Sequence, residues 1–185
     1  MNRCAWVNMK NPVYIRYHDE EWGVPQHDDR ALYELLILES FQAGLSWECV
    51  LNKREHFRRA YDGFDLEKVL RYDEAKVAEL LSDPTIIRNK LKIRASIANS
   101  VIFKQIQEEY GSFDAYIWGY TKGETLVEDY RERTTSPLSD EISKDLKKRG
   151  MKFVGSTVIY SYLQAIGIID GHGDACDCCK AQRSK

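Results

Sequence analysis

The sequence predicts an all-helical protein, and three observations lead to this prediction. Apolar residues recur at helical spacing along most of the chain. Residues that cap helices precede several of these segments, and glycine or proline follows them. No convincing series of alternating strands interrupts the pattern. With 185 residues, 43% of them hydrophobic, the chain suits one domain, or one domain with a closely packed subdomain.

The first predicted helices lie in the N-terminal half of the chain. Asp28 and Asp29 provide N-cap chemistry for a helix that Gly44 ends or bends, and Ser46 can cap a second helix. Asp65 and Asp73 each start a short helix. The residues expected to face inward are, helix by helix, Leu32, Leu35 and Leu36; Trp47, Val50 and Leu51; Leu66, Val69 and Leu70; and Val77, Leu80 and Leu81.

The pattern breaks at Asp83-Pro84, because proline disfavours helix at the residue before it. A long helix is predicted after this break. Its inward face is expected to carry Ile93, Ile97 and Val101.

Two helices are predicted after a long polar loop over residues 119–135. The first begins at Pro137 and ends at Lys147-Lys148-Arg149-Gly150, where cations meet the negative end of the helix dipole and glycine follows the helix. The second is apolar and runs from about residue 156 to 166.

Composition and charge exclude few functions. The net charge of −2 is mildly unfavourable for nucleic-acid binding, but cations concentrate in residues 88–94 and 144–152. Either a solvated helix face or a phosphate-binding surface accounts for such stretches. No segment has the pattern of a signal peptide or the ~18 apolar residues of a membrane helix, so we expect a cytoplasmic protein without a membrane partner.

Four of the five cysteines lie near the two ends of the chain. His172 and Cys176 are spaced i and i+4, which on a helical turn places them on one face. With Cys4 and His18 they would complete the closed tetrahedral set of a structural zinc ion. Cysteines in an incidental reactive tail are the metal-free alternative. The competing ligands in the tail are Cys178 and Cys179.

Aromatic and charged residues alternate in the first 50 residues, which contain Trp6, Tyr14, Tyr17, Trp22 and Trp47. Such residues are most often core, but this mixture is more typical of a polar pocket or a stacking surface. Glu39 extends an apolar stripe by one turn, so its carboxylate points toward the core and needs a partner or a shifted pKa. Pairing with an internal cation and holding a ligand are both open. A bend after Glu39 that returns Trp47 to its side favours the ligand.

Four blocks of sequence resemble the signature blocks of the DNA-3-methyladenine glycosylase I family, and they occur in order. Three positions depart from the expected pattern: Leu91 stands where glycine is expected, and Ala5 and Ser40 are less usual. The blocks are Arg3-Cys4-Ala5-Trp6, residues 17–25 (YHDEEWGVP), residues 42–47 (QAGLSW) and residues 147–155 (KKRGMKFVG).

The resemblance implies a helix-hairpin-helix DNA glycosylase fold in one catalytic unit, residues 1–185. Segments of about 1–25 and 156–180 would form a subdomain against a helical-hairpin subdomain. One structural zinc ion would tie these segments together, and its implied ligands are Cys4, His18, His172 and Cys176.

The implied activity is hydrolysis of the N-glycosidic bond of 3-methyladenine in double-stranded alkylated DNA, a base-excision repair step that releases the free base. Glu39 would recognise the extruded base, surrounded by Trp6, Tyr14, Tyr17 and Trp47. Residues 83–88 resemble the family's hairpin, which grips the DNA backbone. The expected DNA contacts are Leu45, as a wedge, with Arg88, Lys90, Lys92 and Lys148.

The family lacks the catalytic aspartate of most helix-hairpin-helix glycosylases, and no residue here takes that role. Nothing indicates a Schiff-base lysine, so a monofunctional, monomeric enzyme without strand cleavage is expected. The alternative is a zinc-stabilised helical module that binds nucleic acid or a modified base without cutting it.

Overall fold

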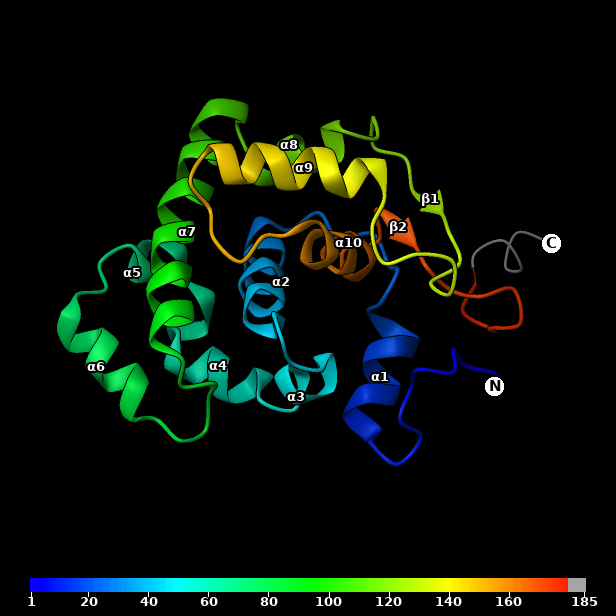
Figure 1. Cartoon of the computed structure of the whole chain (residues 1–185), viewed down its shortest axis with the longest axis horizontal. Coiled ribbons are helices and arrows are strands. Elements are labelled where there is room, and N and C mark those ends of the chain that lie inside the picture. The colour runs from blue at the N-terminus through cyan, green and yellow to red at the C-terminus, as the bar shows by residue number, and fades with distance from the viewer. Residues whose placement is uncertain (180–185) are drawn as a thin grey trace.

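Helices form the frame of the computed structural model, which describes residues 1–179 (Figure 1). Residue 180, at the end of the predicted C-terminal segment, lies outside the described residues. The elements are α1 (Pro12–Glu20), α2 (Asp29–Gln42), α3 (Trp47–Leu51), α4 (Arg54–Ala60), η1 (Asp62–Phe64), α5 (Leu66–Val69), α6 (Glu74–Ser82), α7 (Lys90–Tyr110), α8 (Phe113–Gly119), β1 (Leu126–Val127), α9 (Pro137–Lys148), α10 (Ser156–Ala165) and β2 (Ile169–Asp170).

Helix α2 lies in the middle of the molecule, with α7 on one side and α10 on the other (Figure 1). Every residue from Leu32 to Phe41 is buried. A helix that is buried all round is a core helix, so any polar side chain on it needs a specific reason to be there. This position places Glu39 inside the protein.

The predicted N-caps are confirmed. The side chain of Asp28 accepts a hydrogen bond from the Ala31 amide, and that of Ser46 accepts one from the Cys49 amide. Asp65 and Asp73 cap α5 and α6 in the same way. Each cap satisfies an amide that has no partner within its helix.

The predicted inward face of the long helix is wrong in its second half. Val101 is 44% exposed, whereas Ile102, Phe103 and Ile106 are buried together with Ile93. Helix α7 packs against α5 and α6 along one part and against α8 along another. The buried face therefore shifts along the helix, which a single stripe cannot describe.

Three helices, α1, α4 and α8, were not predicted, and a short parallel sheet occurs where only a loop was expected. In this sheet Leu126 pairs with Ile169, and Val127 pairs with Asp170. The sheet ties the 119–135 segment to the C-terminal segment and fixes the backbone of Asp170. Within residues 1–179, no helix is long and apolar enough to cross a membrane.

Candidate active site

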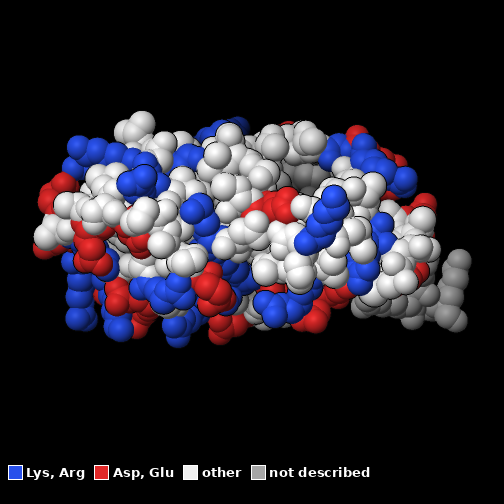
Figure 2. Space-filling model, turned by 90° about the horizontal axis from the view of Figure 1, so that it is seen from below, with Lys and Arg blue, Asp and Glu red and all other residues white. Residues whose placement is uncertain are grey.

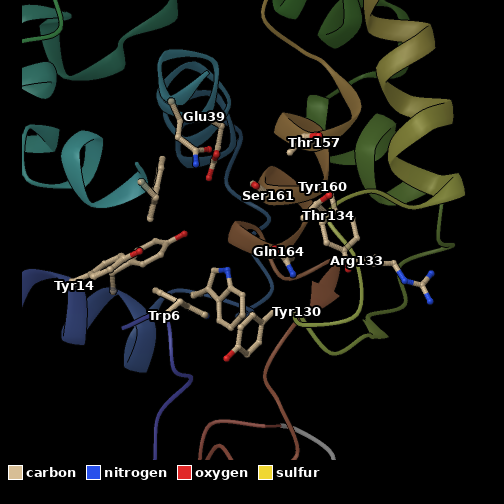
Figure 3. Close-up of a pocket in the computed structure, with 14 residues that line it drawn as sticks. Trp6, Tyr14, Glu39, Tyr130, Arg133, Thr134, Thr157, Tyr160, Ser161 and Gln164 are labelled. Carbon is tan, nitrogen blue, oxygen red and sulfur yellow. The ribbon is translucent and has the colours of Figure 1, made fainter. Parts of the chain in front are cut away.

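A cavity of about 250 Å³ lies among α1, α2, α3 and α10. Figure 3 shows Glu39 entering it from α2, with Trp6 and Tyr14 on one side and α10 on the other. The structure brings together all the residues expected around an extruded base. These lining residues are Trp6, Tyr14, Tyr17, Glu39 and Trp47.

The aromatic side of the cavity, formed by Trp6, Tyr14, Tyr17 and Trp47 and called the aromatic wall, is positioned by local structure. Asn11 caps α1 by accepting hydrogen bonds from the Val13 and Tyr14 amides, and Pro12 occupies the first helical position. Tyr14 and Tyr17 are three residues apart, so they share one face of α1. The ring centroids of Trp6 and Tyr14 are 5.1 Å apart.

The return of Trp47 to the side of α2 depends on a glycine. Gly44 has φ of +77°, a left-handed conformation that glycine adopts without steric cost. Ser46 then starts α3, and the ring centroids of Trp47 and Tyr17 lie 5.5 Å apart. The predicted bend is confirmed, and it closes the aromatic wall beside Glu39.

Glu39 is only 2% exposed, and its Oε2 has no hydrogen-bond partner among the described residues. Burial raises the pKa of its carboxyl group well above the usual range. The structure therefore does not support pairing with an internal cation. A buried carboxyl oxygen without a partner among residues 1–179 is available to a ligand.

Three further buried polar atoms in the same cavity have no hydrogen-bond partner within residues 1–179: Trp6 Nε1, Trp47 Nε1 and Gln164 Nε2. Most buried polar groups in folded proteins are hydrogen-bonded. Donors and an acceptor left without partners in one cavity indicate a polar ligand with complementary groups.

The side of the cavity that faces Glu39 is not predicted from the sequence. It comes from one face of α10 and from the loop before α9, where the Arg133 guanidinium points away from the cavity (Figure 3). Polar residues at positions i, i+4 and i+7 of an otherwise apolar helix were the available signal. The missed lining residues are Gln42, Tyr130, Arg133, Thr134, Thr157, Tyr160, Ser161 and Gln164.

A second cluster joins the two ends of the described chain. His18, His172, Cys176 and Cys178 place one potential ligand atom each within 4.8 Å of one another, so they could hold a metal ion. All four are buried. From the sequence, Cys178 is expected only as a competing ligand.

The histidines are oriented for a metal. Nδ1 of His18 lies 2.8 Å from Oδ1 of Asp19, and Nδ1 of His172 lies 2.6 Å from Oδ1 of Asp170. Carboxylates placed in this way fix the ring and direct Nε2 toward the ion. Nε2 of His172 is buried without a partner. The donor set therefore fits a cation bound between the chain ends.

Cys4 lies beside this cluster, and its amide donates to Nε2 of His18 over 3.4 Å. Burial raises the pKa of the Cys4 thiol to about 12. The helical turn predicted for His172 and Cys176 is wrong: these residues lie in irregular backbone, where the Cys176 amide donates to the Gly173 carbonyl over 2.8 Å.

Most of the predicted DNA contacts lie on the surface. Leu45 is 40% exposed, and Arg88, Lys90 and Lys148 are exposed. On the face shown in Figure 2, cationic and anionic side chains are intermixed around a hollow. Lys92 is the exception, because its ammonium group is buried and donates to backbone carbonyls. The expectation that Lys92 binds phosphate is therefore wrong.

Residues 6–180 match the family model described as Methyladenine glycosylase. The chain belongs to the methyladenine glycosylase family. It is 43% identical to DNA-3-methyladenine glycosylase 1 of Escherichia coli (strain K12), over 96% of this chain and 97% of that protein. It is 35% identical to DNA-3-methyladenine glycosylase of Haemophilus influenzae, over 95% and 97%.

Solved structures of this family share the fold. The 3-methyladenine DNA glycosylase I of Staphylococcus aureus superposes with a TM-score of 0.91 at 36% identity, over 97% of both chains. A tyrosine variant of 3-methyladenine DNA glycosylase I in complex with 3-methyladenine gives a TM-score of 0.91 at 36% identity, over 97% of this chain and 98% of that chain. A structure of this family thus holds the methylated base.

Proposed function

We propose that this protein is a monofunctional DNA glycosylase that removes 3-methyladenine from alkylated double-stranded DNA by hydrolysing the N-glycosidic bond. The observation that carries the proposal is the unpaired carboxylate of Glu39 within a cage of aromatic rings. The names of the relatives and the bound base in a family structure support the choice of substrate.

The pocket suits a cationic purine. Methylation at N3 makes adenine in DNA positively charged, so the base is already a good leaving group and selection against normal adenine becomes the harder task. A cation over an aromatic face gains roughly 0.5–2 kcal/mol relative to a neutral ring. A positively charged base in the pocket would favour the ionised form of Glu39, whose carboxylate could then accept hydrogen bonds from the adenine edge and attract the positive charge. Selectivity thus comes from groups that prefer the damaged base.

The base has to leave the duplex to reach this cavity, which requires a few kcal/mol of unstacking. Leu45, on the bend beside the cavity, would fill the vacated space. Arg88, Lys90 and Lys148 would hold phosphates, together with backbone amides of the hairpin in a helix-hairpin-helix arrangement. Binding to undamaged DNA should then be salt-sensitive with little preference for sequence.

The metal site would hold one zinc ion in a structural role. Thiolate and imidazole ligands in a closed set are typical of structural zinc, which keeps no open position for water. The ion would join Cys4 and His18 to His172 and Cys176, with Cys178 as an alternative thiolate. It would stabilise the N-terminal segment that carries Trp6, and the chemistry would remain in the cavity.

The test is release of free 3-methyladenine from methylated duplex DNA, with the DNA backbone analysed for breaks in the same reaction. We expect base release and intact strands. Binding without release would contradict the enzymatic proposal and favour a module that only recognises the base. Cleavage of the DNA strand in the absence of added alkali would contradict monofunctional hydrolysis.

A further inference from the structure

Lys92 is a buried cation that neither the base pocket nor the metal site explains. It lies in the first turn of α7 and is only 8% exposed. Its Nζ donates to the carbonyl oxygen of Phe41 over 2.8 Å and to that of Ala43 over 2.5 Å. Burial lowers the pKa of its ammonium group. A strongly hydrated ammonium is buried only where such acceptors replace water.

The two carbonyls belong to the end of α2. The last carbonyls of a helix have no partner within it, and that end carries partial negative charge. Ala43 follows the helix with a non-helical backbone, and no Schellman-type hydrogen bond closes the end. Lys92 therefore acts as a cap for α2 that comes from a different helix.

Lys92 follows directly on residues 83–89, a segment with several hydrogen bonds that we call the hairpin segment. Oδ1 of Asp83 accepts hydrogen bonds from the Thr85 amide and hydroxyl. Lys53 donates to the Thr85 carbonyl over 3.0 Å, and the side chain of Asn89 accepts from the Lys92 amide over 3.1 Å. Lys92 is thus held at a fixed place relative to the hairpin segment.

The ammonium group of Lys92 is also bonded to residues 43–46, which we call the bend segment, through the Ala43 carbonyl. The Leu45 amide donates to the Gln42 carbonyl over 2.6 Å, and Leu45 itself is exposed. Gln42 lines the cavity, and Glu39 lies one turn earlier on α2. The bend segment therefore connects an exposed apolar side chain with the rim of the base pocket.

We infer that Lys92 is a positioning residue that fixes the distance between the hairpin segment and the bend segment. The inference rests on the proposed function. DNA held at the hairpin segment would meet Leu45 and the cavity at a set spacing, because Lys92 joins both segments: its backbone amide donates to Asn89 and its ammonium group donates to Ala43. Lys92 touches neither base nor phosphate, and it acts through the carbonyls of Phe41 and Ala43.

The test compares Lys92→Met with Lys90→Met, which removes an exposed cation from the same turn. For Lys92→Met we expect the single-turnover rate of base release at saturating methylated duplex to fall roughly 10- to 100-fold, as misplacement of reacting groups by about 1 Å does. Its affinity for free 3-methyladenine should stay within about threefold of wild type, and its salt dependence of DNA binding should be unchanged. Lys90→Met should instead weaken DNA binding and reduce the salt slope.

A double-mutant cycle with Leu45→Ala tests the route through the bend segment. If Lys92 acts by holding Leu45, the loss from Lys92→Met should be much smaller in the Leu45→Ala background. Lys92→Gln, which keeps a donor on a shorter side chain, replaces Lys92→Met if thermal unfolding shows that the latter does not stay folded.

Three results would overturn the inference: an unchanged single-turnover rate, a salt slope reduced as in Lys90→Met, or an equal loss of free-base affinity and rate. Full additivity with Leu45→Ala would overturn the route through the bend segment. If wild-type protein releases no base at all, the proposed function has failed instead, so the two failures are distinguishable.

Discussion

Glu34 and Glu39 project from the same helix into the interior, yet only Glu34 has cationic partners. Arg54 donates to Oε1 of Glu34 over 2.5 Å, and Arg58 donates to both of its carboxylate oxygens. Oε2 of Glu39 has no partner among the described residues. The same helix thus carries one carboxylate used for stability and one left for a ligand.

Replacement of each by glutamine should separate these roles. We expect Glu39→Gln to lose at least about 100-fold in base release, a loss of about 2.7 kcal/mol in transition-state stabilisation, and to remain folded. Glu34→Gln should lower the free energy of unfolding by about 2 kcal/mol or more, because it leaves Arg54 with only the more exposed Glu21 as an anionic partner. It should keep its activity at temperatures where it is folded. Activity assays and urea unfolding of both variants provide the measurement, and equal effects of the two substitutions would contradict the distinction.

Glu39 should also make stability depend on pH. Its pKa in the folded protein is raised by burial, so the folded state keeps a proton that the unfolded chain releases. Stability should therefore fall as pH rises from the unfolded pKa toward the folded pKa, by at most about 1.4 kcal/mol per pH unit. Glu39→Gln lacks this proton, so its stability relative to wild type should increase over the same range. Urea unfolding between about pH 5 and 8 would show it, and parallel curves for the two proteins would contradict it.

Asp170 should control metal retention through His172. Its carboxylate holds Nδ1 of His172 at 2.6 Å, which leaves Nε2 directed at the other ligands. Asp170→Asn should weaken zinc binding about 10- to 100-fold, as loss of such a partner commonly does. Competition with a chelator followed by metal analysis measures this.

The matched control is Asp177→Asn. Asp177 also joins the chain ends, since its carboxylate accepts from the Asn2 amide over 2.8 Å, but it lies outside the cluster of potential ligands. This variant should keep its zinc. Protein that contains no zinc when purified would contradict the metal site itself.

Features set by residues close together in the sequence could be predicted, whereas features set by contacts between distant parts of the chain could not. The pocket side formed by Glu39 and Trp47 could be predicted, because helical spacing and a glycine bend are local features. The facing wall on α10 could not, since its approach to α2 is set by tertiary packing. Lys92 was misassigned for the same reason: its acceptors, Phe41 and Ala43, lie far away in the sequence. The cap formed by Asn11 before Pro12 would have revealed α1.

The side-chain amide of Gln164 should form a hydrogen bond with the bound base. Its Nε2 is buried in the cavity wall, close to Gly171, and has no hydrogen-bond partner among the described residues. Gln164→Met keeps the shape and removes the unpaired amide, so stability should be unchanged or rise slightly, by up to about 1 kcal/mol. Affinity for free 3-methyladenine should fall about tenfold, the value of one hydrogen bond of about 1.4 kcal/mol.

Gly171→Ala tests the contact between Gln164 and the base in a second way, by displacing the Gln164 side chain. A Cβ there would lie 2.5 Å from Nε2 of Gln164 and 3.0 Å from the ring of Trp22. The Trp22 ring is buried and cannot move aside freely, so Gln164 should be displaced. We expect weaker base binding, as in Gln164→Met, but now with reduced stability, because overpacking in a closed site costs about 1–3 kcal/mol. If Gln164→Met binds the base as wild type does, the amide does not contact it, and any loss in Gly171→Ala comes from Trp22 instead.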